Sequence, residues 1–294
     1  MIDYDSHNWR EHLLDIKGSM VRQISSRVAT CAAWSALVTC VHEYYLPLAV
    51  PAVGHTLIGV ALGLLLVFRT NSSYDRFWEG RRLWGSIVND TRNLARCATV
   101  QLSGSRELVS EVIRWTIAFP YAAMHRLRNQ AGLGPVAEEL DDEEVQSVLQ
   151  SNHPPLAVSQ RISSLLLEAR QQGMISDYVQ MTVDQHVGRL IDSLGGCERI
   201  HNTPLPFAYV VHLRRALIAY CFTLPFALLD SFEWGTIPAT LLIAYLLYGI
   251  EEIGVQIEDP FGQDDNDLPL EQICQRIEGN LRGLLPVEMH VSQT

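Results

Sequence analysis

Apolar residues gather in four runs along the chain, and each run approaches the length of one membrane crossing. About 20 mostly apolar helical residues span a bilayer. The second run, 52–68, offers 17 residues without Asp, Glu, Lys or Arg, and the third and fourth are joined by only six residues, DSFEWG, which predicts a hairpin. The pattern predicts an all-α protein with four transmembrane helices, at 28–48, 52–68, 216–229 and 236–250.

Polar segments surround these runs and complete the domain organisation. Residues 1–27 contain four acidic residues and no apolar core, so they predict a cytosolic N-terminal segment rather than a secretory signal. Residues 69–215 show a helical pattern with polar breaks at 131–135 and 151–155, which indicates a cytosolic helical region. Residues 251–294 are acidic and helical, and predict a cytosolic C-terminal segment.

Basic residues are distributed unevenly over the connections between the runs. The two connections expected outside, 49–54 and 230–235, contain no lysine or arginine, whereas basic residues lie before the first run, after the second and before the third. The positive-inside rule therefore places both termini in the cytosol. A soluble all-helical protein with two buried hairpins is the alternative, because apolar runs of this length also occur in protein cores. The charge asymmetry favours the membrane protein.

The second run has the pattern expected of a pore helix. Val60, Leu64 and Phe68 recur every four residues and drift by only about 40° per step on a helix, so they form a nearly straight stripe. In a symmetric assembly each position would become a ring. Gly59 and Gly63 lie on an adjacent strip, where small residues let helices approach closely. Ordinary helix packing is the alternative interpretation of both features.

The formal net charge of −11 restricts the partners. Binding to a phosphate backbone needs a concentrated positive surface, so nucleic acid is excluded as a partner. The basic residues are 21 arginines and one lysine, Lys17. Planar, permanently charged guanidinium groups suit fixed ion-pair networks.

The sequence lacks the usual catalytic and metal-binding patterns. It contains no GxSxG, HExxH or GxxxxGK[ST] motif, and its six cysteines and ten histidines show no metal-ligand spacing. We therefore expect no enzyme and no required cofactor. A non-conducting membrane scaffold or a membrane enzyme is the alternative from another class, and a five-fold particle with an open axis would favour a channel over both.

Three segments resemble the bestrophin family, namely FRTNSSYDRFWEGRRLWG at 68–85, GGCERIHNTPLPFAY at 195–209 and EDPFGQDDNDLPL at 258–270. The resemblance covers nearly the whole chain, with the four apolar runs in matching order. It implies a homopentameric channel, modulated by a ligand or by calcium, with a narrow hydrophobic neck and a long cytosolic vestibule.

Carried over by position, the resemblance places the pore neck on Val60, Leu64 and Phe68. Animal members have aromatic rings at two of these levels, whereas this sequence has only Phe68, a departure that bears on anion preference. The resemblance also implies a second, cytosolic constriction, which falls on Tyr178 beside Asp177. Packing of Tyr178 within a helical bundle is the alternative.

The acidic turn after PFG resembles the calcium clasp of eukaryotic bestrophins. Asp264 and Asp267 match the ligand positions, whereas Gln263 and Asn266 stand where animal members have acidic residues. Calcium is therefore the one candidate ligand, held at a site that is weaker than in those members or absent. A solvated acidic turn is the alternative.

Together these features predict a channel for small monovalent ions, gated at the hydrophobic neck, with chloride as the default ion. Its partners would be further copies of itself, the lipid membrane and the permeant ions. A sodium-selective channel of the same fold is the alternative, because five acidic copies would concentrate cations in the vestibule. The sequence shows no transit peptide, which points to the inner (plasma) membrane of a bacterial cell.

Overall fold

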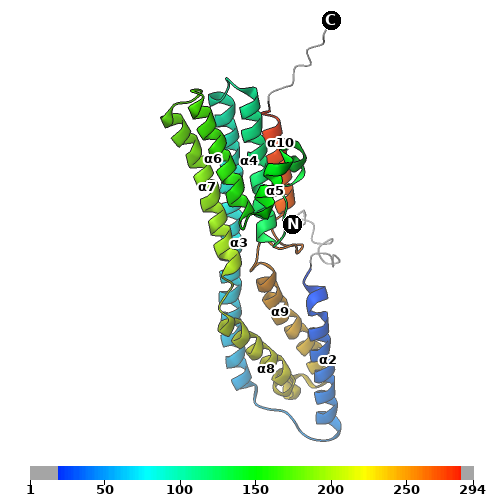
Figure 1. Ribbon diagram of the computed structural model, residues 1–294. Helices are drawn as coiled ribbons and strands as arrows, with labels where there is room; N and C mark the ends of the chain where they lie inside the picture. Colours follow the sequence, from blue (N-terminus) through cyan, green and yellow to red (C-terminus); the bar gives the residue numbers. More distant parts are fainter. Residues whose placement is uncertain (1–18, 286–294) are drawn as a thin grey trace. The chain divides into compact units, whose positions relative to one another are not determined.

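The computed structural model describes residues 19–285, which are all-helical with no β-strand in that range (Figure 1). Most of the predicted N-terminal segment and the end of the C-terminal segment lie outside the described residues. The chain forms two compact units. The first comprises Met1–Trp78 and Thr203–Asp267, and the second comprises Glu79–Asn202 and Leu268–Thr294.

The first unit contains the apolar helices. They are α2 (Val21–Tyr44), the first part of α3 (Ala52–Gln101), α8 (Phe207–Phe232) and α9 (Thr236–Gln256), with a short 3-10 helix, η2 (Glu233–Gly235), between the last two. Within the described residues, three helical stretches are long and apolar enough to cross a membrane: Val21–Tyr44, Ala52–Gln101 and Phe207–Gln256, the last of which includes α8, η2 and α9. Their shared core includes Ile24, Leu62, Leu66, Leu217 and Tyr248.

The two ends of the first unit differ in chemistry. At one end the rings of Tyr44 and Trp234 lie 6.4 Å apart between centroids. At the other end Arg27, Arg214 and Glu251 form ion pairs. Aromatic residues favour the membrane–water interface and ionised groups favour water, so each end has the chemistry expected at a membrane boundary.

Each apolar helix is longer than the apolar run that predicts it. The run at 52–68 continues without a break as α3 to Gln101. The polar part of α3 stays helical because one of its faces is apolar: Trp84, Ile87, Leu94 and Ala98 share that face and are all buried. Charged residues after position 68 therefore end the part of α3 that is compatible with lipid, but the helix itself continues.

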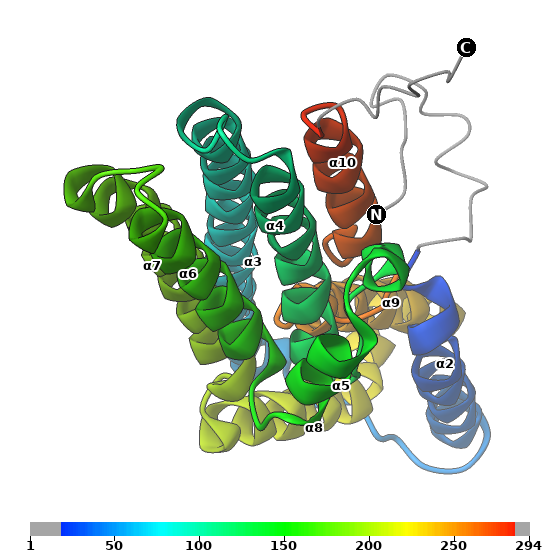
Figure 2. The ribbon, with the colours of Figure 1, turned by 45° about the horizontal axis from the view of Figure 1, so that its top comes forward.

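The second unit is a helical bundle built around α4 (Arg106–Leu127), which packs against both α6 (Pro154–Gln171) and α10 (Leu270–Arg282) (Figure 2). The polar breaks predicted near 131–135 and 151–155 fall in two connections, the first between α4 and η1 (Pro135–Glu139) and the second between α5 (Asp142–Gln150) and α6. At the first break Gly134 has φ +75° and lies against the ring of Tyr121, where a Cβ would come within 2.4 Å of the ring. The other elements of this unit are the second part of α3, η1, α5 and α7 (Asp177–Asn202).

Candidate functional site

The apolar stripe of the second run lies on the exposed side of α3. Val60, Leu64 and Phe68 are 62%, 56% and 62% exposed in the single chain. Leu62 and Leu66 lie on the opposite side of the helix and are buried in the core of the first unit. Packing within the subunit therefore does not account for the stripe, which is left to face lipid, another copy or a pore.

Only one of the two glycines beside the stripe lies against a side chain of another helix of the same chain. A Cβ at Gly59 would lie 2.7 Å from the hydroxyl oxygen of Tyr220 in α8, whereas a Cβ at Gly63 would meet nothing within 4 Å. The ring of Tyr220 also packs on His55, with 4.1 Å between centroids. Gly59 thus leaves room for the ring of Tyr220, while the surface at Gly63 stays open.

A buried ion pair lies on the side of α3 away from the stripe. Arg69 is 1% exposed, and its Nη2 donates to Glu258 Oε2 at 3.1 Å. The other carboxylate oxygen of Glu258 accepts the backbone N–H of Leu205 at 3.0 Å. One carboxylate therefore joins α3 to the segment before α8 and to the segment after α9.

The same three segments are those that carry the family resemblance, and the first unit brings parts of all three together. Arg76 donates its Nε to the carbonyl oxygen of Glu258 at 2.9 Å and its Nη1 to the carbonyl oxygen of Thr203. The hydroxyl of Tyr209 donates to the carbonyl oxygen of Leu65 at 2.9 Å. The hydrogen bonds among these motifs therefore hold the apolar part of α3 in position within the first unit.

Asp267 of the acidic turn is a structural acceptor. It is 3% exposed, and its Oδ2 accepts the backbone N–H of Asp264 at 2.7 Å. A polar cavity of about 250 Å³ adjoins this turn and is lined by residues that include Asp264 and Gln256, but not Asp267. Between residues 19 and 285, no three His, Cys, Asp or Glu side chains come together in a way that could hold a metal ion. A calcium ion here would need backbone carbonyl or amide oxygens as ligands besides the carboxylates.

Replacing Asp267 with alanine is expected to destabilise the acidic turn whether or not calcium is present. The change removes a buried acceptor and leaves the Asp264 N–H without it, at a cost of about 1–3 kcal/mol. Thermal unfolding of the purified protein, in calcium and in a chelator, measures this. Asp264→Ala keeps its backbone N–H and serves as the control. A loss of stability that occurs only in calcium would instead identify Asp267 as a metal ligand.

The proposed aperture residues lie at the start of α7 in the second unit. Tyr178 is 73% exposed in the single subunit. Asp177 is paired with Arg170 of α6, which lowers the pKa of the Asp177 carboxyl group and keeps it ionised. The side chain of Tyr178 is thus not packed inside its own bundle.

The sequence interpretation missed the role of Arg69, although a signal was present. Arg69 lies seven residues after Leu62 and three after Leu66, so it continues the buried face of the helix rather than the exposed stripe. An arginine in phase with core leucines must have a partner, because an unpaired buried charge is very costly. Periodicity therefore predicts the burial of Arg69, while its partner Glu258 is too far along the chain to be identified by spacing.

Comparisons with known proteins agree with this geometry. Residues 1–283 match the family described as Bacterial/Fungal Bestrophin protein. A voltage-dependent anion channel-forming protein of Nostoc sp. is 39% identical over 97% of this chain and 94% of its own length. One from Escherichia coli K12 is 33% identical over 96% of this chain and 93% of its own.

Solved structures lead to the same family. The crystal structure of a bacterial bestrophin homologue from Klebsiella pneumoniae superposes with a TM-score of 0.85 at 30% identity, covering 89% of this chain and 98% of the other. Further similar structures are described as those of a membrane protein, one of them with a TM-score of 0.85 at 29% identity. The apolar helices, the matched motifs and these similarities together show that the chain is a membrane protein of the bestrophin family.

Proposed function

We propose that this protein is one subunit of a homopentameric anion channel in the inner membrane of the cell, with four membrane crossings and both termini in the cytosol. The expectation of a channel rather than an enzyme is confirmed by the family to which the chain belongs. The relatives are named as anion channel-forming proteins, which supports chloride and other small monovalent anions as the permeant ions here. The observation that carries the proposal is the exposed apolar stripe on α3.

The stripe supplies the gate in this proposal. Five copies of Val60, Leu64 and Phe68 around an axis make three successive apolar rings, and a short apolar constriction can close a pore by excluding water. The buried face of the same helix is fixed by Leu62, Leu66 and the Arg69–Glu258 pair. One side of α3 is thus held firmly while the other is free to line the pore.

Tyr178 would form the second constriction, in the cytosolic part of the pathway. Its exposure within the subunit leaves the ring available to an axis. The charge of the neighbouring Asp177 is offset by Arg170, so an approaching anion meets an ion pair rather than a bare carboxylate. Calcium as a modulating ligand remains a prediction from the family resemblance alone.

The reversal potential of the purified protein in planar bilayers under a sodium chloride gradient tests the proposal. An anion channel gives a potential near the chloride equilibrium value. A potential near the sodium value would overturn the anion assignment but keep the channel. Electron micrographs of the same preparation test the assembly, for which any symmetry other than five-fold would be a contradiction.

A cation channel of the same fold has one specific observation in its favour. Asp75 is exposed and lies seven residues after Phe68, only about 20° from it around the helix. Five copies would place five carboxylates next to the neck, where a ring of acidic side chains favours cations.

Replacing Asp75 with asparagine is expected to move the reversal potential towards the chloride equilibrium value, because five negative charges leave the pathway. The shift is measured in the same bilayers and is expected to shrink at high salt, which screens charge. Asp230→Asn removes an exposed carboxylate from the end of α8 and is the matched control. Equal reversal potentials for Asp75→Asn and the wild type would remove Asp75 from the pathway.

A further inference from the structure

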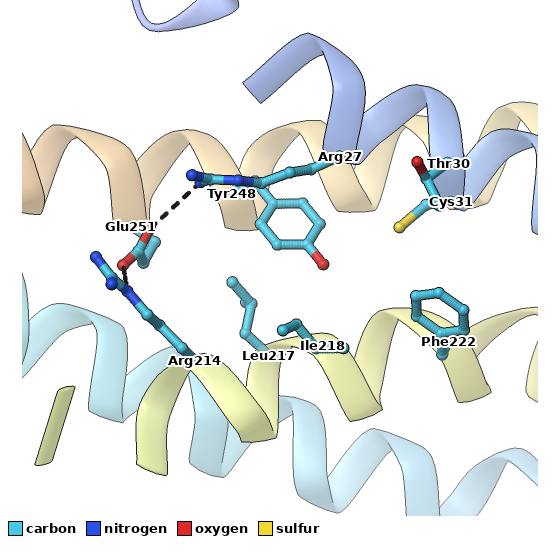
Figure 3. Close-up of a pocket in the computed structure, with 9 residues that line it drawn as sticks. All are labelled: Arg27, Thr30, Cys31, Arg214, Leu217, Ile218, Phe222, Tyr248 and Glu251. Carbon is cyan, nitrogen blue, oxygen red and sulfur yellow. Dashed lines mark hydrogen bonds and ion pairs between the residues drawn. The ribbon is translucent and has the colours of Figure 1, made fainter. Parts of the chain in front are cut away.

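A pocket of about 350 Å³ lies in the first unit between α2, α8 and α9, away from the stripe on α3 (Figure 3). Three charged side chains, Arg27, Arg214 and Glu251, line one end of it. Leu217, Ile218 and Phe222 of α8 continue from there, facing Cys31 and Tyr248. The pocket is therefore charged at one end and apolar along its length.

The charged end pairs two half-exposed arginines with two buried carboxylates, those of Glu251 and Glu252. Arg27 Nη1 lies 3.0 Å from Glu252 Oε2. Glu251 is buried, with a side chain 3% exposed, and its Oε1 accepts Arg214 Nε at 2.9 Å while its Oε2 lies 3.7 Å from Arg27 Nη1. The side chains of Arg27 and Arg214 are 47% and 50% exposed. Figure 3 shows the two arginines reaching Glu251 from opposite helices. Both guanidinium groups are about half exposed to an entering anion, whereas both carboxylates are largely buried.

The apolar part of the pocket has the dimensions of a lipid chain segment. From Arg214 to Phe222 the pocket follows two turns of α8, about 12 Å. Ile218 is half exposed and Phe222 is also exposed, so this side opens outwards, while Tyr248 forms a buried wall. A free phosphate ion would use the arginines but leave this slot empty.

We propose that the pocket binds an anionic phospholipid of the cytosolic leaflet, with its phosphate on Arg27 and Arg214 and an acyl chain along Ile218 and Phe222. The choice of leaflet rests on the topology in the proposed function. Guanidinium groups bind phosphate oxygens through paired, charge-assisted hydrogen bonds, which suits the exposed edges of both arginines. The bound lipid would join α2 to α8, the two helices that carry Arg27 and Arg214.

Native mass spectrometry of the full-length protein, with added phosphatidylglycerol or phosphatidylcholine, tests the proposal. The wild type is expected to retain phosphatidylglycerol in preference, and Arg27→Gln with Arg214→Gln to lose roughly tenfold in that affinity. The matched control is Arg22→Gln with Arg215→Gln. It removes two exposed arginines from the same two helices, outside the pocket, and is expected to keep the preference.

A second variant probes the apolar slot without disturbing the ion pairs. Ile218→Trp fills the slot and is expected to lower phosphatidylglycerol retention, whereas Leu242→Trp, at an exposed position of α9 outside the pocket, is not. This variant keeps the test decisive if the double arginine variant fails to fold.

Three results would overturn the lipid assignment. The first is equal phosphatidylglycerol retention by the wild type, the double arginine variant and Ile218→Trp. The second is complete displacement of the lipid by inorganic phosphate, which would show a free-anion site. The third is a structure of the assembled protein with a side chain of a second copy in the pocket. Because lipid retention is measured without ion flux, a protein that retains lipid but conducts no anions would refute the proposed function and leave this inference standing.

Discussion

Replacing Arg69 with leucine is expected to lower the free energy of unfolding by about 3–5 kcal/mol. The carboxylate of Glu258, which is already largely buried, would then have lost the guanidinium group that pairs with it. The carboxylate of Glu258 also holds the N–H of Leu205, so the segment before α8 loses a fixed partner as well. The expected result is a large drop in the unfolding temperature of the purified protein and in the yield of assembled particles. Thermal unfolding and size-exclusion chromatography measure the two effects.

Two further variants separate loss of the pair from loss of an arginine. Arg82→Leu removes an exposed arginine from the same helix and is expected to change stability by less than about 0.5 kcal/mol. Arg69→Leu combined with Glu258→Gln removes both charges and is expected to recover part of the loss, because the uncompensated carboxylate is gone. If Arg69→Leu and Arg82→Leu unfold at the same temperature, the buried pair has no structural role.

Shortening the neck in Leu64→Ala with Phe68→Ala is expected to raise single-channel conductance several-fold. Both side chains are more than half exposed on the stripe, so the subunit core keeps its packing. Two of the three apolar rings become wider, and the free energy of bringing water and a hydrated ion into the neck falls. Single-channel recording in planar bilayers measures the change, and the fraction of time spent open is expected to rise with it.

The control for the neck variant shortens two exposed apolar side chains on a different helix, α9. Leu242 and Leu246 are also exposed leucines one helical turn apart, on α9. Leu242→Ala with Leu246→Ala is expected to leave conductance unchanged. An unchanged current in the α3 variant would contradict the neck assignment, and a change of the same size in both variants would attribute it to lipid contacts instead of the pore.

Hydrophobicity predicts where the apolar helices lie but not where they end. The third run begins at Ala216, yet α8 begins at Phe207. Arg214 and Arg215 fall in between, and they are compatible with the helix because long arginine side chains can extend to the membrane surface while their stems cover apolar area. A helix segment in lipid needs apolar side chains, which appear in the sequence as an apolar run. A helix outside lipid needs only hydrogen-bonded backbone groups, which leave no such run, so the ends of the helix cannot be predicted from hydrophobicity.

Some features of the candidate site can likewise be predicted from the sequence, and others cannot. The stripe of Val60, Leu64 and Phe68 follows from helical periodicity, and the structure leaves all three exposed. The partnership of Arg69 with Glu258 depends on residues 189 positions apart, which no local pattern encodes. The calcium site at the acidic turn is implied by a family resemblance, whereas the buried hydrogen bond of Asp267 to the backbone of the turn is not encoded in any motif.

The contact between Gly262 and Asp267 has a consequence for how the acidic turn can evolve. A Cβ at position 262 would lie 2.6 Å from Asp267 Oδ2, so any larger residue there collides with the carboxylate that closes the turn. Substitutions at positions 262 and 267 are therefore expected to depend on each other. In a library in which both are randomised and folded protein is selected, side chains larger than glycine at 262 should be recovered mainly with residues smaller than aspartate at 267. Such linked substitution would make the PFG motif a record of the turn's geometry rather than of any ligand.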